Sequence, residues 1–250
     1  MSSDCFGAVR QQFKKEYAAF LDLLFPRTCQ ACGSEAGEQL RYLCWNCLAR
    51  LFLIYPPFCQ ICGNPVEGTI TEKFLCSSCS RHAPFFDIAR SAALYKGILQ
   101  TLVQDFKYHG GTWLAHDFAS LMYQSFITSY SPDQIDAVTY VPLYRVRKRE
   151  RSYNQARLLA EAFVKRLRKP LLHGALCRIR PTVSQTHLTA SKRIANVKHA
   201  FFIRRKNQLT NKRVLLIDDV MTTGATVNEC SRVFIQRPKK RRRLRYRAGG

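Results

Sequence analysis

Two adjacent carboxylates follow a short apolar run near the end of the chain. The run Val214–Ile217 is uninterrupted, as in a buried parallel strand, and Asp218 and Asp219 come directly after it. The acids are therefore expected at the carboxyl end of a strand, where open α/β sheets bind ligands. Adjacent carboxylates can accept hydrogen bonds from vicinal hydroxyl groups, so these residues suit a sugar.

A loop rich in threonine and glycine follows the acids and leads into a predicted helix that ends at Ile235. At a helix N-terminus, free N–H groups, hydroxyls and the helix dipole form a cradle for phosphate, and Gly224 allows close approach. The candidate phosphate-binding residues are Thr222, Thr223, Gly224, Ala225 and Thr226. An ordinary capped helix explains any one of these residues. The whole string favours a sugar phosphate, with a divalent metal nearby.

A second predicted strand, residues 138–143, is followed by a basic segment. Arg145 and Arg151 lie within this segment, and Asn154 and Gln155 then open an amphipathic helix. A basic loop between a strand end and a helix start suits a pyrophosphate group. A solvated charge cluster explains the same residues equally well.

Eight of the 11 cysteines form four Cys-x-x-Cys pairs. The pairs are Cys29/Cys32, Cys44/Cys47, Cys59/Cys62 and Cys76/Cys79. Two such pairs complete a closed tetrahedral zinc site, and a segment this short has too little core to fold without metal. We predict one or two structural Zn²⁺ ions. Sequential pairing is the simplest arrangement, but the spacing does not fix which pairs share an ion.

The formal net charge of the 250-residue chain is +23. This charge favours nucleic acid, an anionic membrane surface or phosphorylated ligands, without choosing among them. No apolar run approaches the roughly 18 residues that span a membrane, and no signal-peptide pattern is present. We therefore expect a cytoplasmic protein.

The string Val214–Thr226 resembles the signature of the type I phosphoribosyltransferases. The resemblance implies that Asp218 and Asp219 hold the ribose hydroxyls of 5-phosphoribosyl 1-pyrophosphate (PRPP) and act as the catalytic acids. It also implies that Thr222 to Thr226 hold the 5′-phosphate and that Mg²⁺ accompanies the pyrophosphate.

The longer pattern resembles the ComF family of competence proteins, which includes GntX-like proteins. The match includes Leu21–Pro26, the Cys29 to Cys79 module, Tyr95-Lys96-Gly97, Lys107, Asn154-Gln155, Thr182, Gln185, Arg193–Asn196 and the Asp218 motif. Lys107 thereby joins Arg145, Arg151, Asn154 and Gln155 as a candidate substrate-binding residue. The family usually has Arg-Gly-Phe before Asn154, whereas this chain has Arg151-Ser152-Tyr153.

We expect an α/β fold with a mainly parallel sheet flanked by helices, preceded by a small zinc-ribbon module. The predicted domains are residues 1–84 (an N-terminal helix and the ribbon), 85–236 (a phosphoribosyltransferase-like domain) and 237–250 (a basic tail). The predicted helices of the second domain are Gly97–Phe106, Leu114–Thr128, Tyr153–Arg168 and Ala225–Ile235. Pro238 should stop the last helix, and we expect no core strand after it. The tail is either the product of a frame shift or truncation, or a natural segment that binds nucleic acid.

Two functions fit this pattern. The first is a phosphoribosyltransferase, a glycosyltransferase that acts on PRPP bound with Mg²⁺. Its acceptor substrate is not indicated by the sequence. The resemblance to the ComF family implies a role in DNA uptake during natural competence. The second is a non-catalytic module that binds single-stranded DNA or a helicase-like competence partner, with a regulatory or vestigial PRPP site.

Overall fold

The computed structural model describes residues 16, 27–37, 40–68, 74–182, 189–235 and 246–249. The chain forms two compact units, residues 1–50 and 51–250. This division comes earlier than the predicted boundary at residue 84, so the second cysteine group shares a unit with the sheet. The predicted N-terminal helix lies outside the described residues, apart from Glu16.

The first unit is organised around a cysteine turn and one short helix, α2 (Trp45–Ala49). Thr28 and Glu35 form an antiparallel bridge across the turn. Gly33 closes the turn with a φ of 77°, a conformation that glycine adopts without a steric penalty. Cys44 caps α2, because its sulfur accepts a hydrogen bond from the Cys47 backbone N–H at 3.5 Å.

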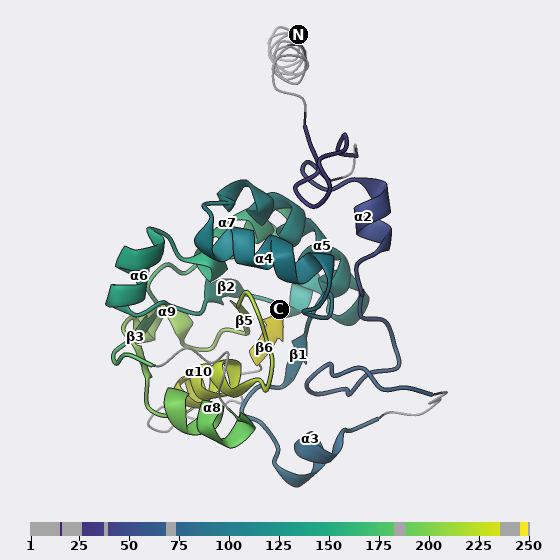
Figure 1. Cartoon of the computed structure of the whole chain (residues 1–250). Coiled ribbons are helices and arrows are strands. Elements are labelled where there is room, and N and C mark those ends of the chain that lie inside the picture. Colours follow the sequence, from purple (N-terminus) through teal and green to yellow (C-terminus); the bar gives the residue numbers. More distant parts are fainter. Residues whose placement is uncertain are drawn as a thin grey trace, which may run out of the picture. The chain divides into compact units, whose positions relative to one another are not determined.

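The second unit contains a four-stranded parallel sheet in the order β1-β6-β5-β2 (Figure 1). Its strands are β1 (Ile88–Arg90), β2 (Ala137–Tyr140), β5 (Val214–Ile217) and β6 (Tyr246–Gly249). Every residue of β5 is buried, as its unbroken apolar sequence predicts. The parallel α/β class predicted from the sequence is therefore confirmed.

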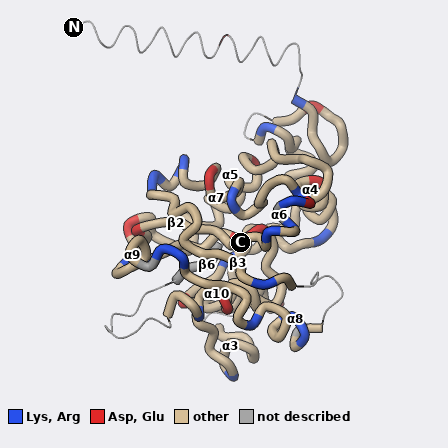
Figure 2. Tube along the Cα trace, turned by 90° about the vertical axis from the view of Figure 1, so that its left-hand side faces the viewer, with Lys and Arg blue, Asp and Glu red and all other residues tan. Residues whose placement is uncertain are grey.

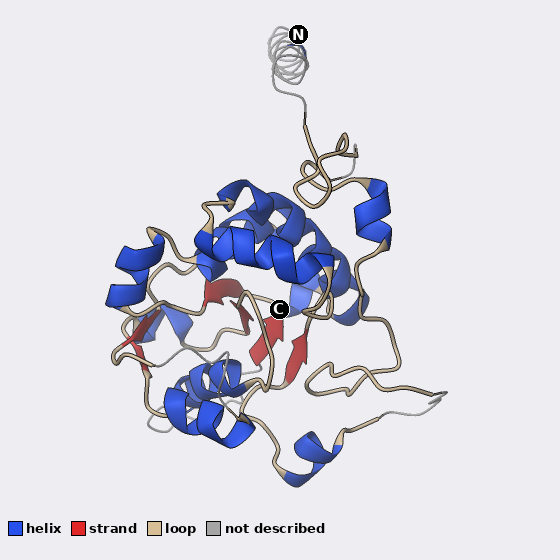
Figure 3. Ribbon diagram, in the orientation of Figure 1, coloured by secondary structure: helices blue, strands red, loops and turns tan. Residues whose placement is uncertain are grey.

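Helices cover both faces of the sheet (Figures 1 and 3). On one side lie α4 (Ile98–Tyr108), α5 (Ala115–Ser129) and α7 (Gln155–Leu167). On the other side lie α8 (Ala190–Val197) and α10 (Ala225–Ile235). The predicted helices of this unit are confirmed, and the bounds of α10 match the prediction residue for residue.

Smaller elements complete the second unit. The strands β3 (Leu176–Arg178) and β4 (Phe201–Ile203) pair antiparallel. The short helices are α3 (Ser77–Arg81), η1 (Thr112–Leu114), η2 (Pro132–Gln134), α6 (Arg145–Arg151) and α9 (Lys206–Leu209). None of the helices within the described ranges has the length and apolar character needed to cross a membrane.

The basic segment after β2 is a helix, α6, so the prediction of a basic loop there was wrong (Figure 2). Arg, Lys and Glu have high helix propensity, which outweighs their mutual repulsion over seven residues. The helix ends at Arg151, and the C-cap residue Ser152 has a φ of 63°. Ser152 occupies the position where the ComF pattern usually has glycine, and it adopts a left-handed conformation that glycine favours.

The strand β6 was not expected. Residues Tyr246–Gly249 pair in parallel with both β1 and β5. The expectation that nothing after Pro238 could form a core strand was wrong for these residues, because ladder pairing uses backbone N–H and C=O groups that every non-proline residue carries.

Candidate functional site

The two predicted acids lie at the carboxyl end of β5 and differ in their surroundings. Asp218 is buried, and its Oδ1 accepts a hydrogen bond from the Asp219 backbone N–H at 2.9 Å. Asp219 is half-buried, and its Oδ1 accepts from the Val220 N–H at 2.7 Å. These backbone bonds fix both carboxylates against the turn that follows the strand.

Burial, reinforced by the Asp219 carboxylate, raises the pKa of Asp218 to about 8. The positive charges of Lys107 and Arg178 oppose this shift without cancelling it. Asp219 has a direct counter-ion instead, because its Oδ2 lies 2.9 Å from Lys107 Nζ. Without a ligand, the site thus holds one carboxyl group that favours its proton and one carboxylate paired with lysine.

Several of the predicted substrate-binding residues meet beside this pair. Gln155 Nε2 donates to the Lys107 carbonyl at 3.3 Å, so the start of α7 contacts the end of α4. Arg151 Nη1 donates to Gln155 Oε1 at 3.4 Å, and Arg151 Nη2 donates to the Tyr108 hydroxyl at 2.9 Å. Lys107, Arg151 and Gln155 therefore form one contact network with Asp219.

Asn154, predicted to bind substrate, has a structural role as the N-cap of α7. It caps α7, where its Oδ1 accepts from the Arg157 N–H at 3.2 Å and its Nδ2 donates to the Val141 carbonyl at 3.1 Å. Tyr153 donates its hydroxyl to the Phe106 carbonyl at 2.7 Å. These bonds hold the start of α7 against β2 and α4.

The threonine–glycine loop leads directly into α10. Gly224 has a φ of 68°, and its carbonyl accepts the first helical bond from Asn228 N–H at 2.8 Å. Thr222 and Thr223 are exposed, whereas Ala225 is buried at the first turn and Thr226 is half-buried. The loop thus presents its hydroxyls and backbone at an accessible helix N-terminus, the geometry that favours anions.

Arg145 is the predicted site residue that the structure does not join to the others. It begins α6 and is exposed, and within the described residues no hydrogen bond or ion pair links it to the two acids. The reason is the helix itself, which turns the basic segment into a compact element instead of a loop laid along the strand ends.

Arg178, at the end of β3, is a candidate that sequence reasoning missed. Burial lowers the pKa of its guanidinium, and the Asp218 carboxylate acts in the opposite direction. The guanidinium packs over the Phe201 ring at 5.3 Å and donates to the Thr182 hydroxyl. Its Nε is buried without a hydrogen-bond partner among the described residues. An arginine just before the Arg180-Pro181-Thr182 string was the only available signal.

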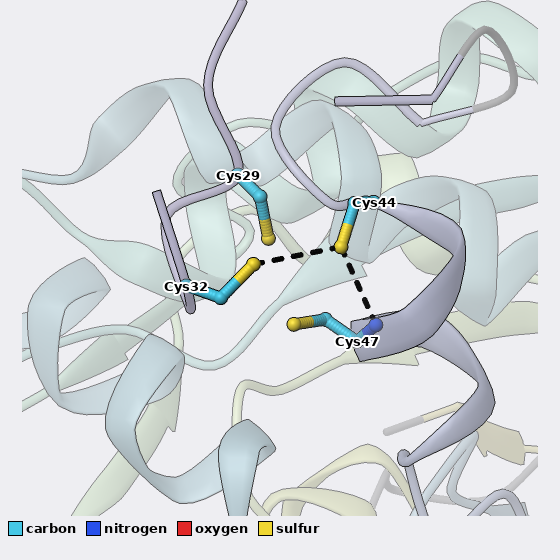
Figure 4. A group of neighbouring side chains, drawn as sticks. All are labelled: Cys29, Cys32, Cys44 and Cys47. Atoms are coloured by element: carbon cyan, nitrogen blue, oxygen red, sulfur yellow. Dashed lines mark hydrogen bonds between the residues drawn. The ribbon is translucent and has the colours of Figure 1, made fainter. Parts of the chain in front are cut away.

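The first cysteine group consists of four side chains that point toward one another (Figure 4). Its members are Cys29, Cys32, Cys44 and Cys47. The sulfurs of Cys32 and Cys44 lie 3.6 Å apart. A tetrahedron with Zn–S bonds of 2.3 Å has edges of about 3.8 Å, so this spacing fits zinc. Hydrogen bonds with Ser34 lower the pKa of Cys32 to about 6, whereas burial raises the pKa of Cys47, so the case for metal rests on the spacing of the sulfurs.

The second group repeats this arrangement next to the sheet. Its members are Cys59, Cys62, Cys76 and Cys79, and all four sulfurs lie within 4.8 Å of one another. The Cys62 and Cys76 sulfurs are 3.7 Å apart. Sequential pairing of the Cys-x-x-Cys turns is therefore confirmed, and both four-cysteine groups support structural zinc.

The second group is attached to β1 by close backbone contacts. Ala89 N–H donates to the Ile61 carbonyl at 2.6 Å, and Arg90 Nη2 donates to the Gln60 carbonyl at 3.0 Å. At Gly63, whose φ is 71°, a Cβ would lie 2.7 Å from the Ala89 carbonyl oxygen. The metal turn thus packs directly on an edge strand of the sheet.

Comparison with known proteins agrees with the two four-cysteine groups. Residues 20–80 match a family model described as a double zinc ribbon domain. Competence protein F of Haemophilus influenzae is 34% identical over 163 residues, covering 64% of this chain and 71% of that protein. Competence protein ComFC of Bacillus subtilis is 29% identical over 150 residues, covering 60% and 59%. DNA utilization protein YhgH of Escherichia coli K12 is 26% identical over 164 residues, covering 64% and 71%. No solved structure matches the chain significantly.

Proposed function

The chain belongs to the ComF family of competence proteins, and we propose that it acts in DNA uptake through a phosphoribosyl site that binds PRPP with Mg²⁺. The site consists of the two acids after β5, the threonine–glycine loop before α10, and Lys107 with its network. A cytoplasmic location and a helicase-like partner belong to the same proposal.

The observation that carries this proposal is the meeting of Lys107 with Asp219 at the end of β5. Lys107 lies 2.9 Å from Asp219, and the buried Asp218 lies beside them. The site therefore offers a ligand both a positively charged group and carboxyl groups. A phosphorylated sugar needs this combination, because its hydroxyls donate to carboxylates and its phosphates require cations or N–H groups. A loop suited to phosphate lies directly beyond the acids.

The proposed reaction is displacement at the anomeric carbon of the ribose. A bond forms between the nucleophilic atom of the acceptor and C1, the C1–O bond to pyrophosphate breaks, and pyrophosphate leaves with the electron pair. The acceptor loses its proton to solvent. Asp218 and Asp219 orient the ribose through its hydroxyls, and the loop fixes the 5′-phosphate, so that C1 is held for attack.

Mg²⁺ bound with the pyrophosphate would neutralise the charge of the leaving group. The donor set suits this ion, because the Asp219 carboxylate supplies the hard oxygen ligand that Mg²⁺ prefers and retains 18% of its side-chain exposure. Lys107 adds a further positive charge beside the acids.

The proposal is tested by calorimetric titration of PRPP and Mg²⁺ into zinc-loaded protein. We expect micromolar binding that the Asp218→Asn/Asp219→Asn variant loses by at least about tenfold, because the ribose hydroxyls lose both carboxyl groups as hydrogen-bond partners. The matched control is Asp133→Asn at an exposed aspartate. Equal affinity in the double variant and the wild type would refute the site.

Exposed aromatic residues near cations favour a second candidate function, binding of single-stranded DNA. Lys96 Nζ lies 3.9 Å from the centroid of the Phe52 ring, and Tyr55 and Tyr95 are exposed on the same pair of bridged segments. Bases stack on such rings, and the net charge of +23 attracts the backbone. Under this alternative the acid double variant keeps its DNA affinity, and added salt weakens binding steeply.

A further inference from the structure

A cavity of about 660 Å³ lies beside the threonine–glycine loop in the second unit. Residues Asp219 to Ala225 form one wall. Leu99 of α4 and Phe118, Leu121 and Met122 of α5 line the cavity as well. The volume falls within the range of pockets that bind small ligands, about 300–1,000 Å³.

The lining of this cavity carries very little charge. Among the described residues no Lys or Arg lines it, although the chain contains 40 of them. The lining carboxylate, Asp219, is already paired with Lys107. The other ionisable lining groups are His82 and three cysteines of the second group, Cys62, Cys76 and Cys79, and none of them is a free cation at neutral pH. An ionised ligand placed among the apolar residues of this cavity, away from the N–H groups of the loop, would lose water without gaining a free counter-ion. The cavity therefore suits an uncharged molecule.

Aromatic side chains join the cavity to the proposed phosphate loop. A Cβ at Gly224 would lie 3.8 Å from the Phe86 ring, so this ring packs on the loop. The neighbouring Phe85 N–H donates to Asn228 Oδ1 in the first turns of α10 at 2.6 Å. Phe85 and Phe86 both line the cavity, which places planar apolar surfaces directly beside the loop.

We propose that this cavity binds an uncharged aromatic molecule, which is the acceptor for the phosphoribosyl group. The inference rests on the proposed function, and it narrows the acceptor to neutral aromatic compounds. It argues against free amino acids, phosphorylated compounds and nucleic acid strands as occupants of the apolar part of the cavity, beyond the loop, because each carries charge that this part of the lining does not match.

The test uses 2-naphthol as a neutral probe and 2-naphthoate as an anion of nearly the same shape. Calorimetry measures each probe, and separately PRPP with Mg²⁺, on three proteins: wild type, Leu121→Trp and Ile127→Trp. Leu121 lines the cavity, whereas Ile127 is exposed on the same helix and does not line it, so Ile127→Trp is the matched control.

We expect 2-naphthol to bind at least about tenfold more tightly than 2-naphthoate, since only the anion has an unpaired charge to bury. Leu121→Trp should lose at least about tenfold in 2-naphthol affinity because the indole fills the cavity, and PRPP affinity should stay within about twofold. Ile127→Trp should match the wild type for all ligands.

The proposal is overturned if 2-naphthol does not bind, if both probes bind equally, or if Leu121→Trp binds 2-naphthol as the wild type does. Failure of the phosphoribosyl site appears separately, as absent PRPP binding in the wild type. Should Leu121→Trp not fold, Leu99→Phe provides a smaller obstruction from α4. The same loss of 2-naphthol affinity is then expected of Leu99→Phe, and wild-type affinity in that variant would overturn the proposal.

Discussion

Lys107 Nζ and Asp219 Oδ2 lie 2.9 Å apart, with 15% and 18% of the respective side chains exposed. The lysine comes from the last turn of α4, and the acid from the turn after β5. The contact is thus long-range in sequence and partly shielded from water, so it is stronger than a surface pair. It links the proposed ribose-binding acid to the network that holds the start of α7.

Replacing Lys107 should weaken PRPP binding more than it weakens the fold. We expect Lys107→Met to lose at least about tenfold in affinity, because the site loses the cation nearest the acids. Calorimetry measures the affinity, and thermal unfolding checks the fold. Lys165→Met, at an exposed position of α7, is the matched control. Unchanged PRPP affinity in Lys107→Met would show that the Lys107–Asp219 ion pair does not contribute to ligand binding.

The raised pKa of Asp218 predicts a pH dependence of stability. With a folded pKa of about 8 against an ordinary value of 3.8, the folded state holds a proton that the unfolded state releases between these values. Its contribution to stability is therefore complete below pH 3.8 and is lost as the pH rises toward 8. Asp218→Asn should remove this loss, which is at most about 1.4 kcal/mol per pH unit.

Denaturant unfolding at pH 5 and pH 8 measures this effect on wild type and variant. Asp136→Asn is the opposite control, because the hydrogen bond from Arg213 lowers the pKa of Asp136. That variant should be destabilised at neutral pH, and the difference should fade as the pH falls toward the acid range. If Asp218→Asn shows the same difference in unfolding free energy between pH 5 and pH 8 as the wild type, Asp218 is not the source of the pH dependence.

Each four-cysteine group should hold one zinc ion. We expect a zinc content of two per chain by elemental analysis, because there are two groups of sulfurs at zinc spacing. The variants Cys44→Ser/Cys47→Ser and Cys76→Ser/Cys79→Ser should each reduce this content by one. A double variant that keeps both ions would contradict the assignment of its two substituted cysteines as zinc ligands.

Substitution of Gly63 should disrupt the contact between the second metal turn and β1. A Cβ at this position lies 2.7 Å from a backbone oxygen that cannot move without shifting the strand, so Gly63→Ala should cost about 2–4 kcal/mol. Gly110→Ala is the control, since its φ of 74° is similar but nothing lies within 4 Å. Chemical denaturation compares the two, and equal losses would mean that only backbone strain matters.

Much of the fold follows from local sequence patterns. The apolar run Val214–Ile217 predicts a fully buried strand, and the Asp218 to Thr226 string fixes the start of α10 because it contains a turn and a helix cap. The Cys-x-x-Cys turns likewise predict metal binding, although their grouping into two sites came from the structure. These features depend on neighbours in sequence, which is why they could be read without the structure.

The remaining features depend on tertiary contacts. The pairing of Lys107 with Asp219 joins segments that are distant in the sequence. Lys107 was predicted as a site residue only because the chain resembles the ComF family. The approach of Arg178 to Asp218 depends on how β3 folds back, which no local spacing encodes. The helix α6 and the strand β6 were missed for a different reason, because charge and composition were weighted above helix propensity and backbone pairing.

The most direct test of the central claim is a crystal structure of the zinc-loaded protein with PRPP and Mg²⁺. The account predicts the ribose hydroxyls against Asp218 and Asp219, and the 5′-phosphate against the backbone N–H groups between Thr222 and Thr226. Ligand density at another place on the protein, or none at saturating PRPP, would contradict the assignment of this site.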